Sequence, residues 1–131
     1  MTGEVYGALR SHTILGRSMT ADTKGADREA FLRGIERAHT AGGLLHHLFG
    51  VRTLTLMDEL RPEASASYLS GLLIGHEVAA TMPAGAHVHL AGDAALCSLY
   101  QTAIEAAGGS ATIEKEDAAA RGLLAIATRL K

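Results

Sequence analysis

The stretch AHVHLAGDAALCSLYQTAIEAAGGSATIEKE, at residues 86–116, decides the fold of this chain. Its opening residues 86–91 alternate small or apolar positions with His87 and His89, and a period of two predicts a strand. Gly92 and Asp93 then break the alternation, because glycine permits a sharp turn and an aspartate can cap the helix that follows. That helix is predicted from apolar residues at helical spacing, which are Leu96, Tyr100, Ala103, Ile104 and Ala107.

A second strand is predicted where this helix ends. Gly108 and Gly109 form a C-cap pair, and Ala111 and Ile113 begin another alternating run. Two strands that are joined by one helix form a parallel pair with a right-handed crossover. Ligands of such sheets bind at the carboxyl ends of the strands, so the turn at Gly92 marks the expected functional edge.

Upstream of this unit, three helices are predicted within residues 1–57. Thr2 can cap a first short helix, and Asp27 can cap a second one. Gly42 and Gly43 separate the second helix from a third, which we extend through residues 51–57 although these also alternate like a strand. The side chains expected to face inward are Val5 and Leu9, then Phe31, Leu32, Ile35 and Ala38, and finally Leu44, Leu45, Leu48 and Phe49.

The longest helix is predicted to open at Pro62 and to end before Pro83. Gly71 and Gly75 lie one turn apart in it; since a glycine inside a helix costs about 1 kcal/mol, close packing of another backbone is the expected reason for them. Its inward face is expected to hold Tyr68, Leu72, Gly75, Ala79 and Met82. A final helix would be capped by Asp117 and would turn Ala120, Leu123, Ala127 and Leu130 inward.

The bulk properties narrow the class of protein. A length of 131 residues suits one domain, and we expect a single domain over residues 1–131 with a flexible loop at residues 18–26. The formal net charge of −2 gives no electrostatic reason to expect nucleic acid or a membrane as partner. Cys97 is the only cysteine and is expected in the core, which is consistent with a cytoplasmic location, and residues 1–10 lack the pattern of a signal peptide.

The seven histidines raise the question of a metal site. His87 and His89 share one side of a strand, whereas the adjacent His46 and His47 diverge by about 100° on a helix. No cysteine or histidine pair has zinc spacing, and the second histidine of an HExxH helix is missing after His76 because residue 80 is alanine. No metal site is therefore expected.

Four stretches, in this order along the chain, resemble one family. They are MTGEVYGALRSHTILG at residues 1–16, GGLLHHLFGVRTL at 42–54, YLSGLLIGHE at 68–77 and LAGDAALCSLY at 90–100. Together they resemble the 2-dehydro-3-deoxygalactonokinase family, which is similar to the sugar kinases of the actin, hexokinase and heat-shock ATPase superfamily. The resemblance covers nearly the whole chain.

The resemblance implies a fold and an activity. The fold class would be α/β: a C-terminal ribonuclease-H-like half-domain, helix-rich, with a late parallel β-α-β unit. Two strands are too few for a self-sufficient sheet, and the remaining strands would lie in a missing N-terminal domain. The full enzyme would use ATP and Mg²⁺ to phosphorylate the 6-hydroxyl of 2-dehydro-3-deoxy-D-galactonate. The family's Asp-Trp-Gly-Thr and Pro-Gly-Thr-His phosphate segments have no counterpart here, so no catalytic residue is expected and the isolated chain should be inactive.

The resemblance also implies site residues. Gly92, Asp93 and Ala94 correspond to the adenosine motif, although the family usually has proline where Ala94 stands; proline at a first helical position is helpful but not required. Arg52 lies in the apolar stretch LFGVRTLTL and needs a partner if it is buried. A nucleotide or sugar phosphate and an internal salt bridge are equally good partners for it.

Other classes of protein stay open. The chain could be a non-enzymatic α/β binding or assembly module that keeps the scaffold without a nucleotide, or a histidine-based metal protein. A sheet that is separated from its first strands exposes an edge and apolar surface. Self-association, as a homodimer for example, is therefore expected.

Overall fold

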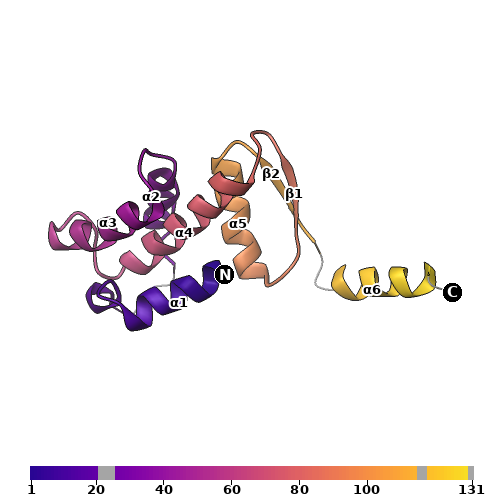
Figure 1. Ribbon diagram of the computed structural model, residues 1–131, viewed down its shortest axis with the longest axis horizontal. Helices are drawn as coiled ribbons and strands as arrows, with labels where there is room; N and C mark the ends of the chain where they lie inside the picture. Colours follow the sequence, from indigo (N-terminus) through magenta and orange to yellow (C-terminus); the bar gives the residue numbers. More distant parts are fainter. Residues whose placement is uncertain (21–25, 115–117, 130–131) are drawn as a thin grey trace. The chain divides into compact units, whose positions relative to one another are not determined.

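The computed structural model describes residues 1–20, 26–114 and 118–129. The chain divides into two compact units, Met1–Met82 and Pro83–Lys131. The first is helical. In chain order it contains α1 (Thr2–His12), the short 3₁₀ helix η1 (Gly16–Ser18), α2 (Arg28–Ala38), α3 (Leu44–Leu56) and α4 (Ser65–Thr81) (Figure 1).

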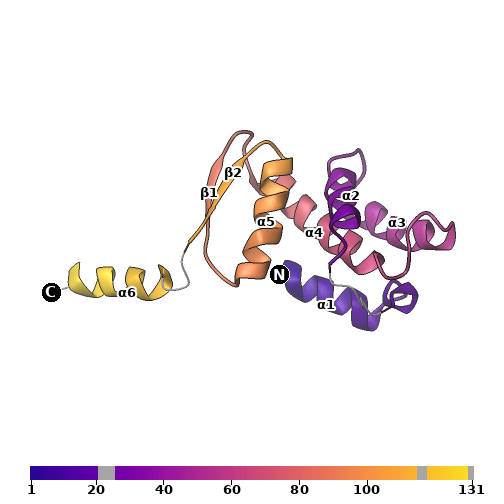
Figure 2. The same cartoon turned by 180° about the vertical axis from the view of Figure 1, so that it is seen from behind.

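Helix α4 is the centre of the first unit, and α2 packs along it (Figures 1 and 2). Glycines at the crossing allow this close approach, as predicted for Gly71 and Gly75. A Cβ atom at Gly71 would overlap with the carbonyl oxygen of Phe31 in α2, and one at Gly75 would lie 2.9 Å from the Cβ of Ala38. Helices α1 and α3 contact α4 as well, and the shared core consists mainly of Ala30, Ala38, Leu48, Val51, Tyr68, Leu69, Leu72 and Leu73.

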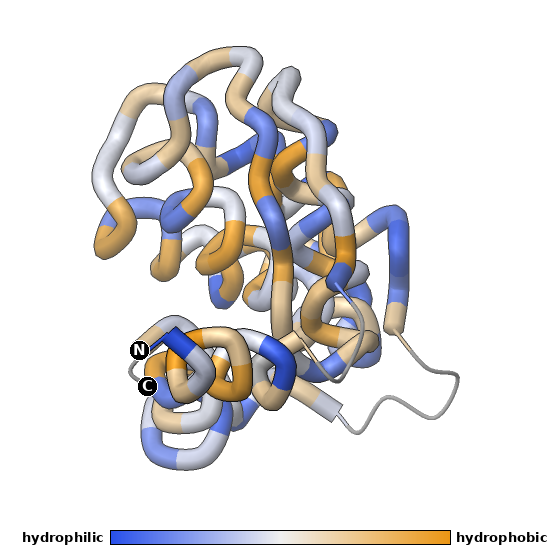
Figure 3. Tube along the Cα trace, turned by 90° about the vertical axis from the view of Figure 1, so that its right-hand side faces the viewer, coloured by the Kyte–Doolittle hydropathy of each residue, from blue (hydrophilic) through white to orange (hydrophobic). Residues whose placement is uncertain are grey.

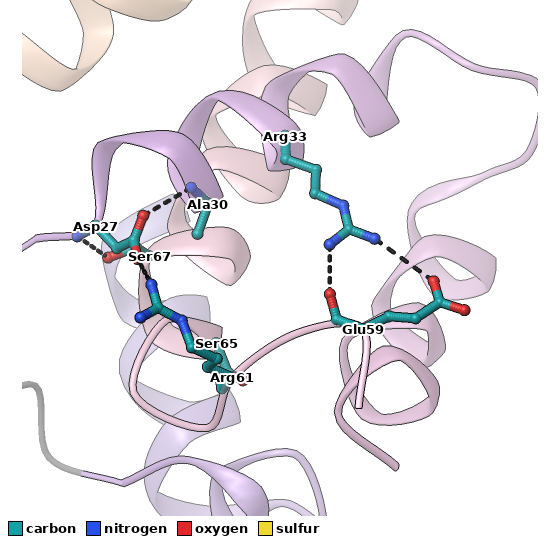
Figure 4. A network of polar contacts seen from close by, with 7 residues as sticks. All are labelled: Asp27, Ala30, Arg33, Glu59, Arg61, Ser65 and Ser67. Atoms are coloured by element: carbon teal, nitrogen blue, oxygen red, sulfur yellow. Dashed lines mark hydrogen bonds and ion pairs between the residues drawn. The ribbon is translucent and has the colours of Figure 1, made fainter. Parts of the chain in front are cut away.

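Polar contacts hold the start of α2 in place (Figure 4). Asp27 is the N-cap, as predicted: its Oδ1 accepts a hydrogen bond from the Ala30 amide at 2.9 Å. The Asp27 amide donates to Ser67 Oγ of α4 at 2.9 Å, and Arg61 Nη2 lies 2.8 Å from Asp27 Oδ2. A single aspartate thus joins the start of α2 to α4 and to the turn that precedes it.

Two predicted helix starts are wrong. Helix α4 begins at Ser65 rather than Pro62, because residues 61–64 form a turn in which the Ala64 amide donates to the Arg61 carbonyl at 3.0 Å. Thr2 does not cap α1: Met1 occupies the cap position without a side-chain bond. Thr2 lies inside the helix, where its hydroxyl donates to Glu77 Oε2 at 2.7 Å.

Helix α3 has a different buried face from the one predicted. The structure confirms a helix over the ambiguous stretch and ends it at Leu56, but Leu45 is 83% and Phe49 is 61% exposed. The buried side chains are His47, Leu48 and Val51. The apolar residues of α3 lie on all sides of the helix, so periodicity could not select the face that meets α4. In α4 itself Ala79 is exposed and Val78 is buried in its place.

The second unit contains the predicted parallel β-α-β arrangement. Strand β1 (His87–Leu90) pairs in parallel with β2 (Ser110–Ile113), with His87 opposite Ser110 and Leu90 opposite Ile113. Hydropathy alternates along β1 (Figure 3). Helix α5 (Ala94–Ala106) connects the two strands and packs on them. The chain then turns at Gly108, whose φ is 80°.

The register of α5 differs from the prediction by one residue at its start. Cys97, Ala103 and Ile104 are buried, as the core position of the cysteine predicts, but Leu96 is 50% exposed. Successive helical residues point about 100° apart. The face that carries Cys97 toward the strands therefore turns Leu96 to solvent.

The last helix, α6 (Ala118–Arg129), does not bury the residues expected to face inward. Leu123 is 69% exposed, and Ala120 and Ala127 are exposed as well. Spacing indicates which side chains share a face, but not whether anything covers that face. The predicted cap Asp117, the inward Leu130 and most of the predicted loop, residues 21–25, lie outside the described residues. None of the described helices is long and apolar enough to cross a membrane.

Candidate functional site: the turn between β1 and α5

The predicted turn lies directly between β1 and α5. Gly92 has a φ of 157°, at the edge of the region that residues with a side chain rarely adopt. Asp93 is the N-cap of α5, because its Oδ1 accepts a hydrogen bond from the Leu96 amide at 2.9 Å. Ala94 is the first residue of the helix. The three predicted residues are thus consecutive parts of one strand-to-helix turn.

This turn is open to solvent. Residues 91–96 are all exposed. A Cβ atom at Gly92 would have a single neighbour within 4 Å, the Cys97 sulfur at 3.8 Å. Internal packing therefore does not require a glycine here, and its bare backbone leaves room for a flat group from outside. The half-exposed Leu96 adds an apolar side chain beside the turn, and the start of a helix favours negative charge.

Arg52 lies in the other unit, on α3. The half-buried side chain donates from Nη1 to the Ile14 carbonyl at 3.5 Å. Within the part of the chain that the structure describes it forms no ion pair. Its local partner is therefore a main-chain oxygen rather than the acidic side chain considered from the sequence.

Several histidine rings lie close to one another, and those of His46 and His47 have centroids 5.4 Å apart. His47 is fully buried, and its Nδ1 lies 2.9 Å from Nε2 of His76. Burial, followed by the charges of His47 and His39, lowers the pKa of His76. His87 and His89 share one side of β1, as predicted, with ring centroids 5.1 Å apart. Within residues 1–20, 26–114 and 118–129, no group of three or more His, Cys, Asp and Glu side chains is placed to hold a metal ion.

The first unit also contains a cavity of about 430 Å³ that no sequence pattern predicted. It lies among α2, α3 and α4, and its polar lining includes Arg33, Arg37, Thr40, Thr53 and Tyr68. For Tyr68, helical spacing predicts only a place on the inward face of α4. The one available signal was the pair Arg33 and Arg37, four residues apart and hence on one face of a helix.

A family profile described as 2-keto-3-deoxy-galactonokinase matches residues 1–126. The chain belongs to this 2-keto-3-deoxy-galactonokinase family. The resemblance drawn from the four sequence stretches is thereby confirmed.

Individual members of the 2-keto-3-deoxy-galactonokinase family show how far the similarity extends. The chain is 36% identical over 122 residues to a 2-dehydro-3-deoxygalactonokinase of Escherichia coli. It is 34% identical over 134 residues to a Rhizobium meliloti protein named for the same activity. A crystal structure of a Sinorhizobium meliloti protein, also named as a 2-dehydro-3-deoxygalactonokinase, matches 99% of this chain with a TM-score of 0.79 and 30% identity.

The chain spans less than half the length of these relatives. It covers 41% of the Escherichia coli protein, 44% of the Rhizobium meliloti protein and 45% of the crystal structure. The match covers 91% and 98% of this chain in the two sequence comparisons. Both units described above therefore have counterparts in the 2-keto-3-deoxy-galactonokinase family.

Proposed function

We propose that this chain supplies the adenosine-binding part of an enzyme that transfers the γ-phosphoryl group of ATP to the 6-hydroxyl of 2-dehydro-3-deoxy-D-galactonate. Membership in the 2-keto-3-deoxy-galactonokinase family supports the reaction and its substrate. The parallel β-α-β unit supports assignment of the chain to a helix-rich, C-terminal ribonuclease-H-like half-domain of the actin-like superfamily.

The open turn at Gly92 is the observation that carries this proposal. It follows a parallel strand at its carboxyl end, which is where ligands of α/β sheets bind. The adenine and ribose would lie against the bare Gly92 backbone, with Asp93 fixing the start of α5 and Leu96 contacting the ring. Any side chain at Gly92 would occupy that space.

The chemistry of phosphoryl transfer needs groups beyond this turn. Such reactions depend mainly on positioning, on Mg²⁺ and on stabilisation of the charge on the transferred group. Mg²⁺ would accompany the ATP phosphates, and no residue of this chain is assigned to it. The phosphate-binding segments and the catalytic base are proposed to lie in the part of the relatives that this chain does not span.

Isothermal titration with ATP and ADP tests the nucleotide site. The 131-residue chain should bind both with measurable heat, and Gly92→Val should abolish the heat because the side chain fills the space for the base. Gly108→Val is the matched control, since Gly108 also has a positive φ and lies beyond the opposite end of α5. An absence of heat with the unaltered chain would favour a non-enzymatic module, and so would equal heats from the two variants.

A phosphorylation assay tests whether the isolated chain has kinase activity. The 131-residue chain, mixed with ATP, Mg²⁺ and 2-dehydro-3-deoxy-D-galactonate, should give no ADP above background, while the full-length Escherichia coli relative serves as the positive control. Turnover by the chain alone would contradict the assignment of the phosphate-binding groups and the base to another part of the enzyme.

A further inference from the structure

The cavity among α2, α3 and α4 combines positive charge with hydroxyl groups. Six polar side chains line its walls: Arg33, Glu36 and Arg37 of α2, Thr40 just after it, Thr53 of α3 and Tyr68 of α4. Its volume of about 430 Å³ lies within the range of roughly 300–1,000 Å³ that is typical of small-molecule sites. All six residues belong to the first unit.

Tyr68 of α4 contributes a hydroxyl group to the lining of this cavity. The residue is only 2% exposed, and a buried tyrosine hydroxyl normally has a hydrogen-bond partner. Within the described residues, the Tyr68 hydroxyl forms no hydrogen bond. Every fully buried side-chain oxygen and nitrogen among those residues has a partner, so the Tyr68 oxygen is not fully buried. The hydroxyl is therefore at the accessible wall of the cavity that its side chain lines.

The two arginines differ in how much charge they offer. Arg33 is engaged by Glu59: its Nη1 donates to the Glu59 carbonyl at 2.6 Å, and its Nη2 lies 3.7 Å from the carboxylate (Figure 4). Arg37 has no acidic partner among the residues described and donates only a long bond, at 3.4 Å, to Nε2 of His46. One guanidinium thus remains for a ligand anion.

The oxygen atoms on the cavity walls indicate which other groups a ligand would carry. Thr40 donates its hydroxyl proton to the Arg37 carbonyl at 2.8 Å, and Thr53 donates to the Gly50 carbonyl at 3.2 Å. Thr40 Oγ1 also lies 3.5 Å from His47 Nε2, and each threonine oxygen keeps a lone pair as an acceptor. The Glu36 carboxylate on the same wall is an acceptor too. These groups suit ligand hydroxyls, and Glu36 would repel a doubly charged anion such as phosphate more strongly than a singly charged carboxylate.

We propose that this cavity binds a small hydroxylated carboxylate, with Arg37 and the Tyr68 hydroxyl donating to its carboxylate and Thr40, Thr53 and Glu36 accepting from its hydroxyls. Burial raises the pKa of Tyr68 above its ordinary value of 10.0, against the opposing effect of Arg37 and Arg33, so the hydroxyl stays a donor at neutral pH. The sugar acid of the proposed function belongs to this ligand class, and its choice as the natural ligand rests on that function.

Titration of the ¹⁵N-labelled 131-residue chain, followed by NMR, tests the site with three probes. D-Galactonate supplies a carboxylate with hydroxyls, galactitol supplies the hydroxyls without the charge, and inorganic phosphate supplies charge without a carbon chain. D-Galactonate should bind at least about ten-fold more tightly than either of the others, since a charge-assisted bond contributes about that factor. The shifted amides should lie in α2, α3 and α4.

Variants assign the binding to this cavity. Arg37→Gln should weaken D-galactonate binding by about ten-fold or more, and Tyr68→Phe by about three- to ten-fold, because each removes a donor to the carboxylate. Arg28→Gln is the matched control, because Arg28 is exposed on the same helix and lies outside the cavity lining. This variant should bind D-galactonate with unchanged affinity. The Arg37→Gln and Tyr68→Phe variants should both keep the amide spectrum of the folded chain.

Several results would overturn the inference: no response to D-galactonate, equal binding of galactitol, tighter binding of phosphate, or an affinity unchanged by Arg37→Gln. The nucleotide site is measured separately by titrating the same samples with ATP. A chain that binds D-galactonate but not ATP keeps the cavity assignment and contradicts the proposed function. The opposite result removes the cavity assignment alone.

Discussion

At Gly71, the backbone of α4 passes directly against the Phe31 carbonyl of α2, and no space remains for a methyl group. Sequence reasoning could identify this residue because a glycine inside a helix is costly unless packing requires it. It could not identify the partner helix, since Phe31 and Gly71 are forty residues apart in the chain.

Gly71→Ala should lower the free energy of unfolding by about 1–3 kcal/mol, because α2 and α4 must move apart to admit the methyl group. Gly7→Ala provides the comparison. Gly7 lies within α1 with no atom near its missing side chain, and the substitution should stabilise the protein by about 0.5–1 kcal/mol. Chemical denaturation of both variants measures the difference. Equal effects of the two substitutions would show that the crossing of α2 and α4 does not need a glycine.

The buried contact between His47 and His76 predicts that the stability of the protein depends on pH. Because the pKa of His76 is lowered in the folded protein from its ordinary value of 6.5, the unfolded chain takes up a proton before the folded one does. The stability that the neutral His76 ring gives to the folded protein is therefore fully present above pH 6.5. It is lost as the pH falls toward the pKa of His76 in the folded protein. Denaturation between about pH 7.5 and 5.5 should show falling stability.

His76→Gln should flatten that pH dependence, because the glutamine amide can still form a hydrogen bond with His47 Nδ1 but does not titrate in this range. His12→Gln, at an exposed histidine at the end of α1, is the control and should leave the slope in place. If the slope survives in the His76 variant, then other groups cause the loss of stability in acid.

At the scale of elements, the helix starts show how local the sequence signals are. Asp27 and Asp93 cap α2 and α5 as predicted, and each accepts a bond from the amide three residues ahead. Such caps depend only on neighbouring residues, so the sequence suffices to find them. Pro62 also looked like a helix start, but the turn at residues 61–64 delays α4 until Ser65.

Asp27 separates capping from ion pairing. Asp27→Ala should destabilise the first unit by about 1–2 kcal/mol through loss of the cap. Asp27→Asn should cost less than about 1 kcal/mol, because asparagine also caps and the lost partner Arg61, whose side chain is 75% exposed, forms a pair of little strength. Thermal unfolding by circular dichroism compares them. Equal losses would assign the stabilisation to the ion pair instead.

At the scale of the whole molecule, apolar side chains remain in contact with solvent. On α3, Leu45, Phe49 and Leu56 are each more than 60% exposed, and their spacing places them on one side of the helix. Exposed apolar surface of this kind favours association, so the expectation of a homodimer or larger assembly remains a prediction.

Light scattering at several protein concentrations tests self-association. The apparent mass should rise with concentration, and Phe49→Ser should reduce that rise because it removes the central apolar side chain of the row. Thr81→Ser, at an exposed position at the end of α4, should leave it unchanged. A mass that stays at 13.6 kDa throughout would exclude association in this range.

The sequence by itself determined the β-α-β unit and the family. The alternation of β1, the glycine turn, the Asp93 cap and the glycine stop after α5 all follow from residues a few positions apart. The candidate turn at Gly92 could be located for the same reason. Backbone conformation and capping are local, so neighbouring residues are enough to predict each strand, turn and cap of this unit.

Only the tertiary structure decided which faces are buried. Leu45 and Phe49 are as apolar as Leu48, yet they remain exposed while His47 is buried, because the position of α4 selects one side of α3. The cavity depends in the same way on Arg37 and Tyr68, which are distant in the chain and meet only when α2 packs on α4. Burial is a property of the partner as well as of the residue, and no local pattern contains the partner.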